Sequence, residues 1–212
     1  MAGKFISFEG PDGAGKTSVM KQLGVTLQDQ LGDQLLMTRE PGGNSISEAI
    51  RQIILDPKNT QMDARTEALL YAAARRQHLV EQIIPALNAD RVVLCDRYVD
   101  SSIAYQGAGR QIGEEAVWTM NQFAIDGLEP DLTIYLDIAS EEGIARIMAH
   151  RTSEINRLDV EQLAFHQRVR RAYLRLQKAY PERIKLIDAS QPLEQVIADV
   201  KQAISQKYPQ LF

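Results

Sequence analysis

The residues with the clearest chemistry lie between Gly10 and Thr17, which read G-P-D-G-A-G-K-T. This order fits the pattern G-x-x-x-x-G-K-[ST], and it stands between a strand-like run, KFISFE, and a helical pattern, as a phosphate loop requires. Glycines let backbone N–H groups turn inward around an anion, and a helix starting near Lys16 directs its positive end there. We therefore predict that a nucleoside triphosphate is bound by Gly10, Pro11, Asp12, Gly13, Ala14, Gly15, Lys16, Thr17 and Ser18.

Three arginines stand where an acceptor would be held, namely Arg39, Arg51 and Arg97. The loop alone does not separate GTPase switches, motor ATPases and small-molecule kinases. No N-K-x-D motif of the guanine-specific switches occurs, so ATP is the expected donor. Because guanidinium groups match phosphate oxygens two at a time, the arginines predict an acceptor that is itself a monophosphate.

These residues need a scaffold, and the chain shows an alternation of strand-like and helical segments. The strand-like runs are KFISFE, QLLMT, RVVLCD, DLTIYLD and RIKLID. Apolar residues three and four apart predict helices over 45–55, 64–89, 114–125, 141–149, 160–180 and 193–206. This order predicts an α/β fold with a parallel five-stranded sheet and helices on both faces. In such sheets ligands bind at the carboxyl ends of the strands, where the polar clusters stand.

Length and charge narrow the class of protein. A chain of 212 residues predicts one domain, 1–212. With 28 acidic and 24 basic residues the net charge is −4, so we expect no nucleic-acid partner. No run of about 18 uncharged apolar residues occurs, so we expect no membrane association. The single cysteine, Cys95, excludes an internal disulfide and is expected in the core, which favours a cytoplasmic protein.

The chain resembles bacterial thymidylate kinase, which transfers the γ-phosphate of ATP to dTMP. The resemblance runs from Phe5 to at least Tyr180 and rests on FEGPDGAGKT, TREPGG, EALLYAAARRQH, VLCDRYVDSSIAYQGAGR, PDLTIYLD and NRLD, in the family's order. It implies the P-loop nucleoside monophosphate kinase architecture with a short lid, near 150–159, that closes over ATP. Members of this family are commonly homodimers, which we also expect here.

The resemblance implies roles for the residues around the acceptor phosphate. Arg39, Arg51 and Arg97 look like its ligands. Glu40 and Asp96 look like carboxylates that orient those arginines or bind water on Mg²⁺. The metal itself is assigned to Thr17 and Asp96, since a phosphate-loop hydroxyl and a carboxylate suit Mg²⁺.

The resemblance also implies how the thymine base and the sugar are recognised. Tyr71 stands where the family usually has a phenylalanine stacked on thymine. Arg75 looks like the donor to the thymine O4, while Ser102 and Gln106 read the N3 and O4 edge. Tyr105 matches a tyrosine that packs near the 2′ carbon and would crowd a ribose hydroxyl.

Catalysis is expected without a general base, because the second pKa of a phosphate monoester is about 6 and the acceptor oxygen is already ionised at neutral pH. Lys16, Mg²⁺ and arginines, Arg97 among them, would steady the moving phosphoryl group. Asp12 either orients groups near the phosphates or is a turn residue of the sequence PDG. Since the loop holds no arginine, the resemblance is to the lid-arginine type, with Arg151 and Arg157 in the lid.

Two other functions fit the phosphate loop. A deoxynucleoside kinase acting on thymidine shares the loop and the lid, but it needs a carboxylate base and has little use for Arg39 and Arg51. A nucleotide-regulated binding module would hydrolyse ATP whether or not an acceptor is present. No histidine is assigned to catalysis, since His78 and His150 have no nearby partner pattern for metal or base chemistry and His166 lies at helical spacing with apolar residues.

Overall fold

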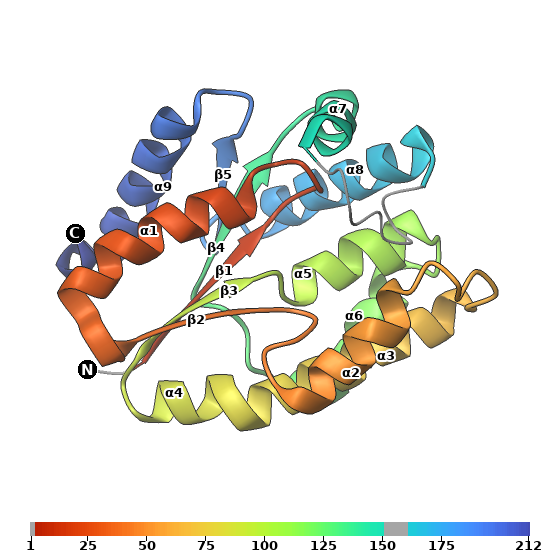
Figure 1. The fold of residues 1–212 in the computed structure, drawn as a ribbon, viewed down its shortest axis with the longest axis horizontal. Helices are drawn as coiled ribbons and strands as arrows, with labels where there is room; N and C mark the ends of the chain where they lie inside the picture. The colour runs from red at the N-terminus through yellow and green to blue at the C-terminus, as the bar shows by residue number, and fades with distance from the viewer. Residues whose placement is uncertain (1–2, 151–160) are drawn as a thin grey trace.

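A single sheet of five parallel strands organises the described residues, 3–150 and 161–212, of the computed structural model. The strand order is β2-β3-β1-β4-β5 (Figure 1). The strands are β1 Lys4–Glu9, β2 Leu35–Arg39, β3 Val92–Asp96, β4 Leu132–Asp137 and β5 Ile184–Asp188. This confirms the predicted fold class, and each strand-like run of the sequence forms one of these strands.

Helices cover both faces of the sheet because its strands alternate apolar residues between two cores. Ile6 and Phe8 of β1 pack with α1 and α9, whereas Phe5 belongs to a second core with α8 and the segment after β3. Figure 1 shows α1 and α9 on one side of the sheet and α8 on the other. The α-helices are α1 Lys16–Leu31, α2 Ser45–Leu55, α3 Ala64–His78, α4 Ile84–Asn88, α5 Val99–Ser102, α6 Glu114–Ile125, α7 Ser140–His150, α8 Leu163–Ala179 and α9 Leu193–Lys207. No helix in the described ranges is both long and apolar enough to cross a bilayer.

Two helical segments differ from the sequence-based prediction. The segment predicted as one helix over 64–89 is α3 and α4 joined by π-helical turns over Leu79–Ile83. Pro85 has no N–H for the carbonyl of Glu81 four residues earlier, so the hydrogen-bond register shifts at this point. After β3, the polar cluster becomes α5 and a π-helical run, Ile103–Gly109, that is almost wholly buried.

The register of the strands aligns their carboxyl ends. Arg39, the last residue of β2, pairs with Asp96 at the end of β3. Asp96 in turn pairs with Phe8 of β1, one residue before that strand ends. The phosphate loop and the segments after β2 and β3 therefore start at one edge of the sheet.

Two glycines let the phosphate loop make its turn. Gly13 and Gly15 have φ angles of 81° and 85°, which favour glycine. A Cβ atom on Gly13 would lie 2.2 Å from the carbonyl oxygen of Gly143 in α7, whereas a Cβ atom on Gly15 would meet nothing within 4 Å. The loop is therefore packed against α7 at Gly13 and open at Gly15.

This difference predicts unequal effects of two alanine substitutions on the free energy of unfolding without ligand. Gly15→Ala should lower the free energy of unfolding only by the strain of placing alanine in a left-handed backbone conformation, about 1–2 kcal/mol. Gly13→Ala costs the same and in addition displaces α7, so it should lower the free energy of unfolding measurably more. Urea unfolding of both variants measures the difference, and equal destabilisation would contradict the packing of α7 on the loop.

Candidate active site

A cavity of about 1040 Å³ opens at the carboxyl edge of the sheet. It collects most of the residues that the sequence analysis singled out. Those that line it are Asp12, Gly13, Ala14, Gly15, Lys16, Thr17, Ser18, Arg39, Glu40, Arg51, Tyr71, Arg75, Asp96, Arg97, Ser102, Tyr105 and Gln106. Gly10 and Pro11 are not among the lining residues, and Arg151 and Arg157 lie outside the described residues.

The Lys16 ammonium folds back onto its own loop. Its Nζ donates to the carbonyl oxygens of Gly10 at 3.0 Å and Pro11 at 2.9 Å. Burial lowers the pKa of Lys16 to about 8, and the charge of Arg97 acts in the same direction. The helix that begins at Lys16 has no acidic residue in its first turn. An anion in the loop would therefore supply the countercharge that this end of the cavity needs.

Thr17 and Asp96 lie together at the end of β3. The Thr17 hydroxyl donates to Asp96 Oδ2 at 3.2 Å. Asp96 Oδ1 is buried, and no residue in the described ranges donates to it. A buried carboxylate oxygen without a donor calls for a cation or an ordered water. These two side chains therefore fit a hard divalent metal such as Mg²⁺.

Asp12 holds Arg97 and Tyr105 in place. Arg97 Nη2 lies 2.7 Å from Asp12 Oδ1, and the Tyr105 hydroxyl donates to Asp12 Oδ2 at 2.9 Å. The guanidinium of Arg97 also stacks over the Tyr105 ring, 4.9 Å from its centroid. Asp12 thus makes contacts that a turn residue does not require, and they join the phosphate loop to Arg97 and Tyr105 in the segment after β3.

Arg39 and Arg51 bring two further cations to the cavity. Arg39 Nη1 lies 2.6 Å from Glu48 Oε1, and Arg51 Nη1 donates to the carbonyl oxygen of Pro41 at 3.0 Å. Burial lowers the pKa of Arg51, and the charge of Arg39 lowers it further. Because the two guanidinium groups repel each other, an anion between them would relieve the repulsion.

Arg75 is almost completely buried and held by four groups. Its Nε donates to Glu40 Oε2 at 2.7 Å. Its Nη1 donates to Ser102 Oγ at 3.1 Å and to the side chain of Asn121, and its Nη2 donates to the carbonyl oxygen of Tyr98 at 3.0 Å. Among the described residues, Glu40 therefore pairs with Arg75 and not with Arg39, Arg51 or Arg97, which the resemblance had implied as its partners.

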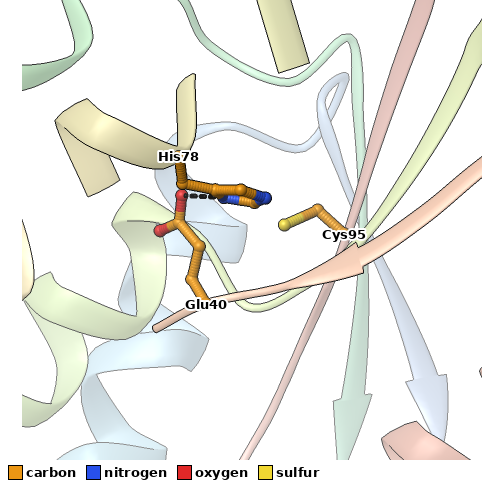
Figure 2. A group of neighbouring side chains, drawn as sticks. All are labelled: Glu40, His78 and Cys95. Carbon is orange, nitrogen blue, oxygen red and sulfur yellow. Dashed lines mark hydrogen bonds and ion pairs between the residues drawn. The ribbon is translucent and has the colours of Figure 1, made fainter. Parts of the chain in front are cut away.

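Glu40, His78 and Cys95 form a buried cluster (Figure 2), which Glu40 connects to Arg75. Their potential ligand atoms lie within 4.8 Å of one another, a spacing that a metal could use. However, His78 Nδ1 already bonds Glu40 Oε1 at 3.1 Å, and His78 Nε2 bonds Thr38 Oγ1 at 2.7 Å. The other oxygen of Glu40 is taken by Arg75, and burial raises the pKa of the Cys95 thiol well above its usual range.

The cluster is therefore a hydrogen-bonded support for Arg75 rather than a metal centre, since each potential ligand is protonated or already paired. It also corrects the sequence analysis, which gave His78 no partner. Its partners, Thr38 and Glu40, come from β2 and the loop after it, about 40 residues earlier.

The remaining base-reading candidates lie along one wall. Ser102 and Gln106, four residues apart, are both buried and line the cavity. Gln106 Nε2 donates to Glu67 Oε1 at 2.9 Å. Tyr71 also faces the cavity, and its hydroxyl forms no hydrogen bond with a described residue.

Glu9 is a functional candidate that the sequence analysis missed. Its Oε1 accepts from the backbone N–H of Tyr98 at 2.7 Å. Its Oε2 accepts from the hydroxyls of Ser101 at 2.5 Å and Tyr173 at 2.9 Å. Burial raises the pKa of Glu9 to about 7, and Asp100 acts in the same direction. Its partners lie up to 164 residues away, so no local pattern points to them.

The far end of the cavity was also missed. It lies between α7 and the loop after β5, and its lining includes Arg146, Ile147, Ala189, Ser190, Gln191, Pro192, Leu193 and Val196. Arg146 is held there by the carbonyl of Ala189 at 2.9 Å and by Glu142 at 2.7 Å. The only sequence signal for this part of the cavity was that the loop follows a strand, and ligands bind at the carboxyl ends of the strands in such sheets.

Comparison with known proteins gives a consistent result. A family model described as thymidylate kinase matches residues 8–200. The chain is 66% identical to the thymidylate kinase of Limosilactobacillus reuteri (strain DSM 20016), with 100% of each chain covered. It is 65% identical to that of Latilactobacillus sakei subsp. sakei (strain 23K), covering 100% of this chain and 99% of the relative. Its structure resembles thymidylate kinase from Ehrlichia chaffeensis with a TM-score of 0.79 and 31% identity, covering 97% and 99% of the two chains.

The raised pKa of Glu9 predicts a pH dependence of stability. Between pH 4.5 and about 7 the folded protein keeps a proton that the unfolded chain releases. The contribution of Glu9 is therefore fully present below pH 4.5 and is lost as pH rises through about 7. The free energy of unfolding of the wild type relative to Glu9→Gln should fall between pH 5 and pH 8, as measured by urea unfolding. Glu115→Gln, at an exposed position, is the control, and a pH-independent difference for Glu9→Gln would contradict the raised pKa.

Proposed function

Because the chain belongs to the thymidylate kinase family and transfers the γ-phosphate of ATP to dTMP to form dTDP, we propose that the cavity holds both nucleotides, with their phosphates meeting at the phosphate loop. The observation that carries this proposal is that one continuous cavity joins the phosphate loop to a cluster of arginines. Its two ends then serve the two nucleosides.

The acceptor phosphate is bound by Arg39, Arg51 and Arg97. All three line the cavity, and the unfavourable proximity of Arg39 and Arg51 supports a dianion between them. Without substrate, Arg97 pairs with Asp12 and Arg39 with Glu48. Binding of dTMP then exchanges or shares these carboxylate partners, and guanidinium groups suit such bidentate sharing.

The nucleophile is an oxygen of the dTMP phosphate, which is ionised at neutral pH, so no side chain needs to remove a proton. Asp12 accordingly acts as an orienting group for Arg97 and Tyr105, as its contacts support. Lys16 and Arg97 balance the negative charge of the phosphoryl group in transfer.

Mg²⁺ is held by Thr17 and Asp96, whose unpaired buried oxygen supports a cation at this point. When bound, the metal neutralises charge on the phosphates of ATP. The donor base occupies the far end of the cavity, where Arg146 and the loop 189–193 offer a flat cation and backbone groups. Residues 150–159 act as the lid with Arg151 and Arg157, a proposal that rests on the sequence.

The thymine base stacks on Tyr71 and is read by Arg75, Ser102 and Gln106. Their shared wall of the cavity supports this arrangement. Tyr105 is held by Asp12 near the phosphates and limits the room beside the sugar. Room for the 5-methyl group separates thymine from uracil, a difference worth about 1–3 kcal/mol.

A homodimer is the proposed assembly. Large apolar side chains are exposed on neighbouring helices α2, α3 and α6, notably Phe123, with 93% exposure, Leu69 and Ile53. Burying them against a second copy would remove this apolar surface from water. A cytoplasmic location stays a prediction that the free thiol of Cys95 supports.

Release of ADP from ATP by the purified protein tests the proposal. We expect fast release with dTMP, slow release with dUMP or the ribose analogue of dTMP, and none with thymidine or without acceptor. A chelator of divalent metals should abolish release, and added Mg²⁺ should restore it. Release with thymidine but not dTMP would show that the arginines do not bind an acceptor phosphate. It would support a deoxynucleoside kinase instead, a function that the comparisons do not favour. Equal release of ADP with and without an acceptor would leave only the binding of a nucleoside triphosphate by the phosphate loop supported.

A further inference from the structure

The side-chain amide of Gln106 has a fixed direction because of Glu67. Gln106 Nε2 lies 2.9 Å from Glu67 Oε1, and both side chains are buried. A glutamine amide has a donor end and an acceptor end that are nearly equal in shape, so only its partners decide which end faces a ligand. A carboxylate accepts hydrogen bonds and cannot donate, so it holds the –NH₂ end.

Arg110 keeps Glu67 in the carboxylate form. Arg110 Nη2 lies 3.2 Å from Glu67 Oε2, and Arg110 Nε bonds the two carboxylate oxygens at 3.2 and 3.3 Å. Arg110 is itself fixed by Glu161 and by the ring of Phe165, which its guanidinium covers at 5.1 Å. The contacts with Arg110 favour the charged form of this fully buried carboxylate, since proton uptake by Glu67 would take away one of the two carboxylate partners of the guanidinium.

With its –NH₂ held by Glu67, Gln106 turns its carbonyl oxygen toward the cavity, which it lines. No residue in the described ranges donates to this oxygen, so it can accept from a ligand. Arg75 provides the opposite polarity on the same wall. Its hydrogen bonds to described residues use four of its five N–H groups, which leaves one N–H on Nη2 for a ligand.

The Gln106 carbonyl as a fixed acceptor and the Arg75 N–H as a fixed donor match the hydrogen-bonding edge of thymine and mismatch that of cytosine. Thymine offers an N3–H donor and an O4 acceptor. A 4-aminopyrimidine such as cytosine offers an N3 acceptor and an amino donor, so each contact would oppose like with like. Such mismatches leave buried polar groups unpaired, which costs much more than a missing methyl group.

We propose that Glu67 is a positioning residue that sets the polarity of Gln106 and so excludes 4-aminopyrimidine monophosphates from the acceptor site. This inference rests on the proposed role of Gln106 in reading the base. It assigns the discrimination to a carboxylate that does not touch the substrate.

The test compares kcat/KM for dTMP with kcat/KM for 5-methyl-dCMP, which differs from dTMP only at N3 and position 4 of the base. In Glu67→Gln the new amide can donate or accept, so Gln106 can turn over. We expect the dTMP to 5-methyl-dCMP ratio to fall at least about tenfold, through a higher KM for dTMP and a lower KM for 5-methyl-dCMP. The kcat for dTMP should change little.

Glu161→Gln is the matched control, because it removes the outer partner of Arg110 and leaves the Glu67–Gln106 contact in place. Its ratio should equal that of the wild type. Arg110→Met is a second variant for the case that Glu67→Gln folds poorly. Without the cation, Glu67 can take up a proton and donate to Gln106, so the ratio should fall here as well.

Gln106→Ala distinguishes the proposed role of Gln106 in reading the base from the role of Glu67 in orienting Gln106. If it raises the KM for dTMP and lowers the ratio while Glu67→Gln and Arg110→Met keep the wild-type ratio, the role of Glu67 is wrong and that of Gln106 stands. If Gln106→Ala changes neither quantity, Gln106 does not read the base, and both the proposed role and this inference fail.

Discussion

The constraint on which the site depends is that several of its charged side chains are withdrawn from water before any substrate arrives. A buried charge costs several kcal/mol unless it is paired and hydrogen-bonded. The protein meets this cost by pairing cations with carboxylates from distant segments: Arg75 with Glu40, and Arg110 with Glu67. Because these pairs form on folding, the donors and acceptors of the cavity already have fixed directions. Substrate binding then need not order long, flexible side chains, which would cost entropy.

The parallel sheet makes these pairings possible. Its register brings the ends of β1, β2 and β3 to one edge, so segments far apart in the sequence can exchange contacts there. The pairs fall into two groups. Asp12–Arg97 and Glu48–Arg39, which the proposal places at the phosphates, are partly exposed, and we expect them to change partners when a dianion binds. The other two pairs, Glu40–Arg75 and Glu67–Arg110, involve buried carboxylates. In the proposed assignment they stand behind the base, so we expect recognition of the base to be rigid while the phosphate end adapts.

The sequence allowed the fold and many of the residues that line the cavity to be predicted, because both leave local patterns. The run Gly10–Thr17 carries its own geometry, and the apolar spacing of α2 and α6 predicts their bounds to the residue. Two supporting carboxylates, Glu67 and Glu9, could not be predicted, since Glu67 reaches Gln106 across 39 residues and Glu9 reaches Tyr173 across 164. A buried glutamate on a helix looks like a solvated one until the fold places its partner. The π-helical run after β3 was missed for a similar reason, because its polar residues face a buried cavity instead of solvent.

The most direct test of this account is calorimetric binding of thymidine and of dTMP to Glu40→Gln. If Glu40 acts through Arg75 on the base, the affinities for thymidine and for dTMP should fall by the same factor, and the affinity for ATP with Mg²⁺ should be unchanged. Glu48→Gln, which alters the partner of Arg39, should change the affinity for dTMP and leave that for thymidine as it is. A loss in Glu40→Gln confined to dTMP or to ATP with Mg²⁺ would place Glu40 at the phosphates or the metal, and would contradict a fixed base-reading wall built on paired buried charges.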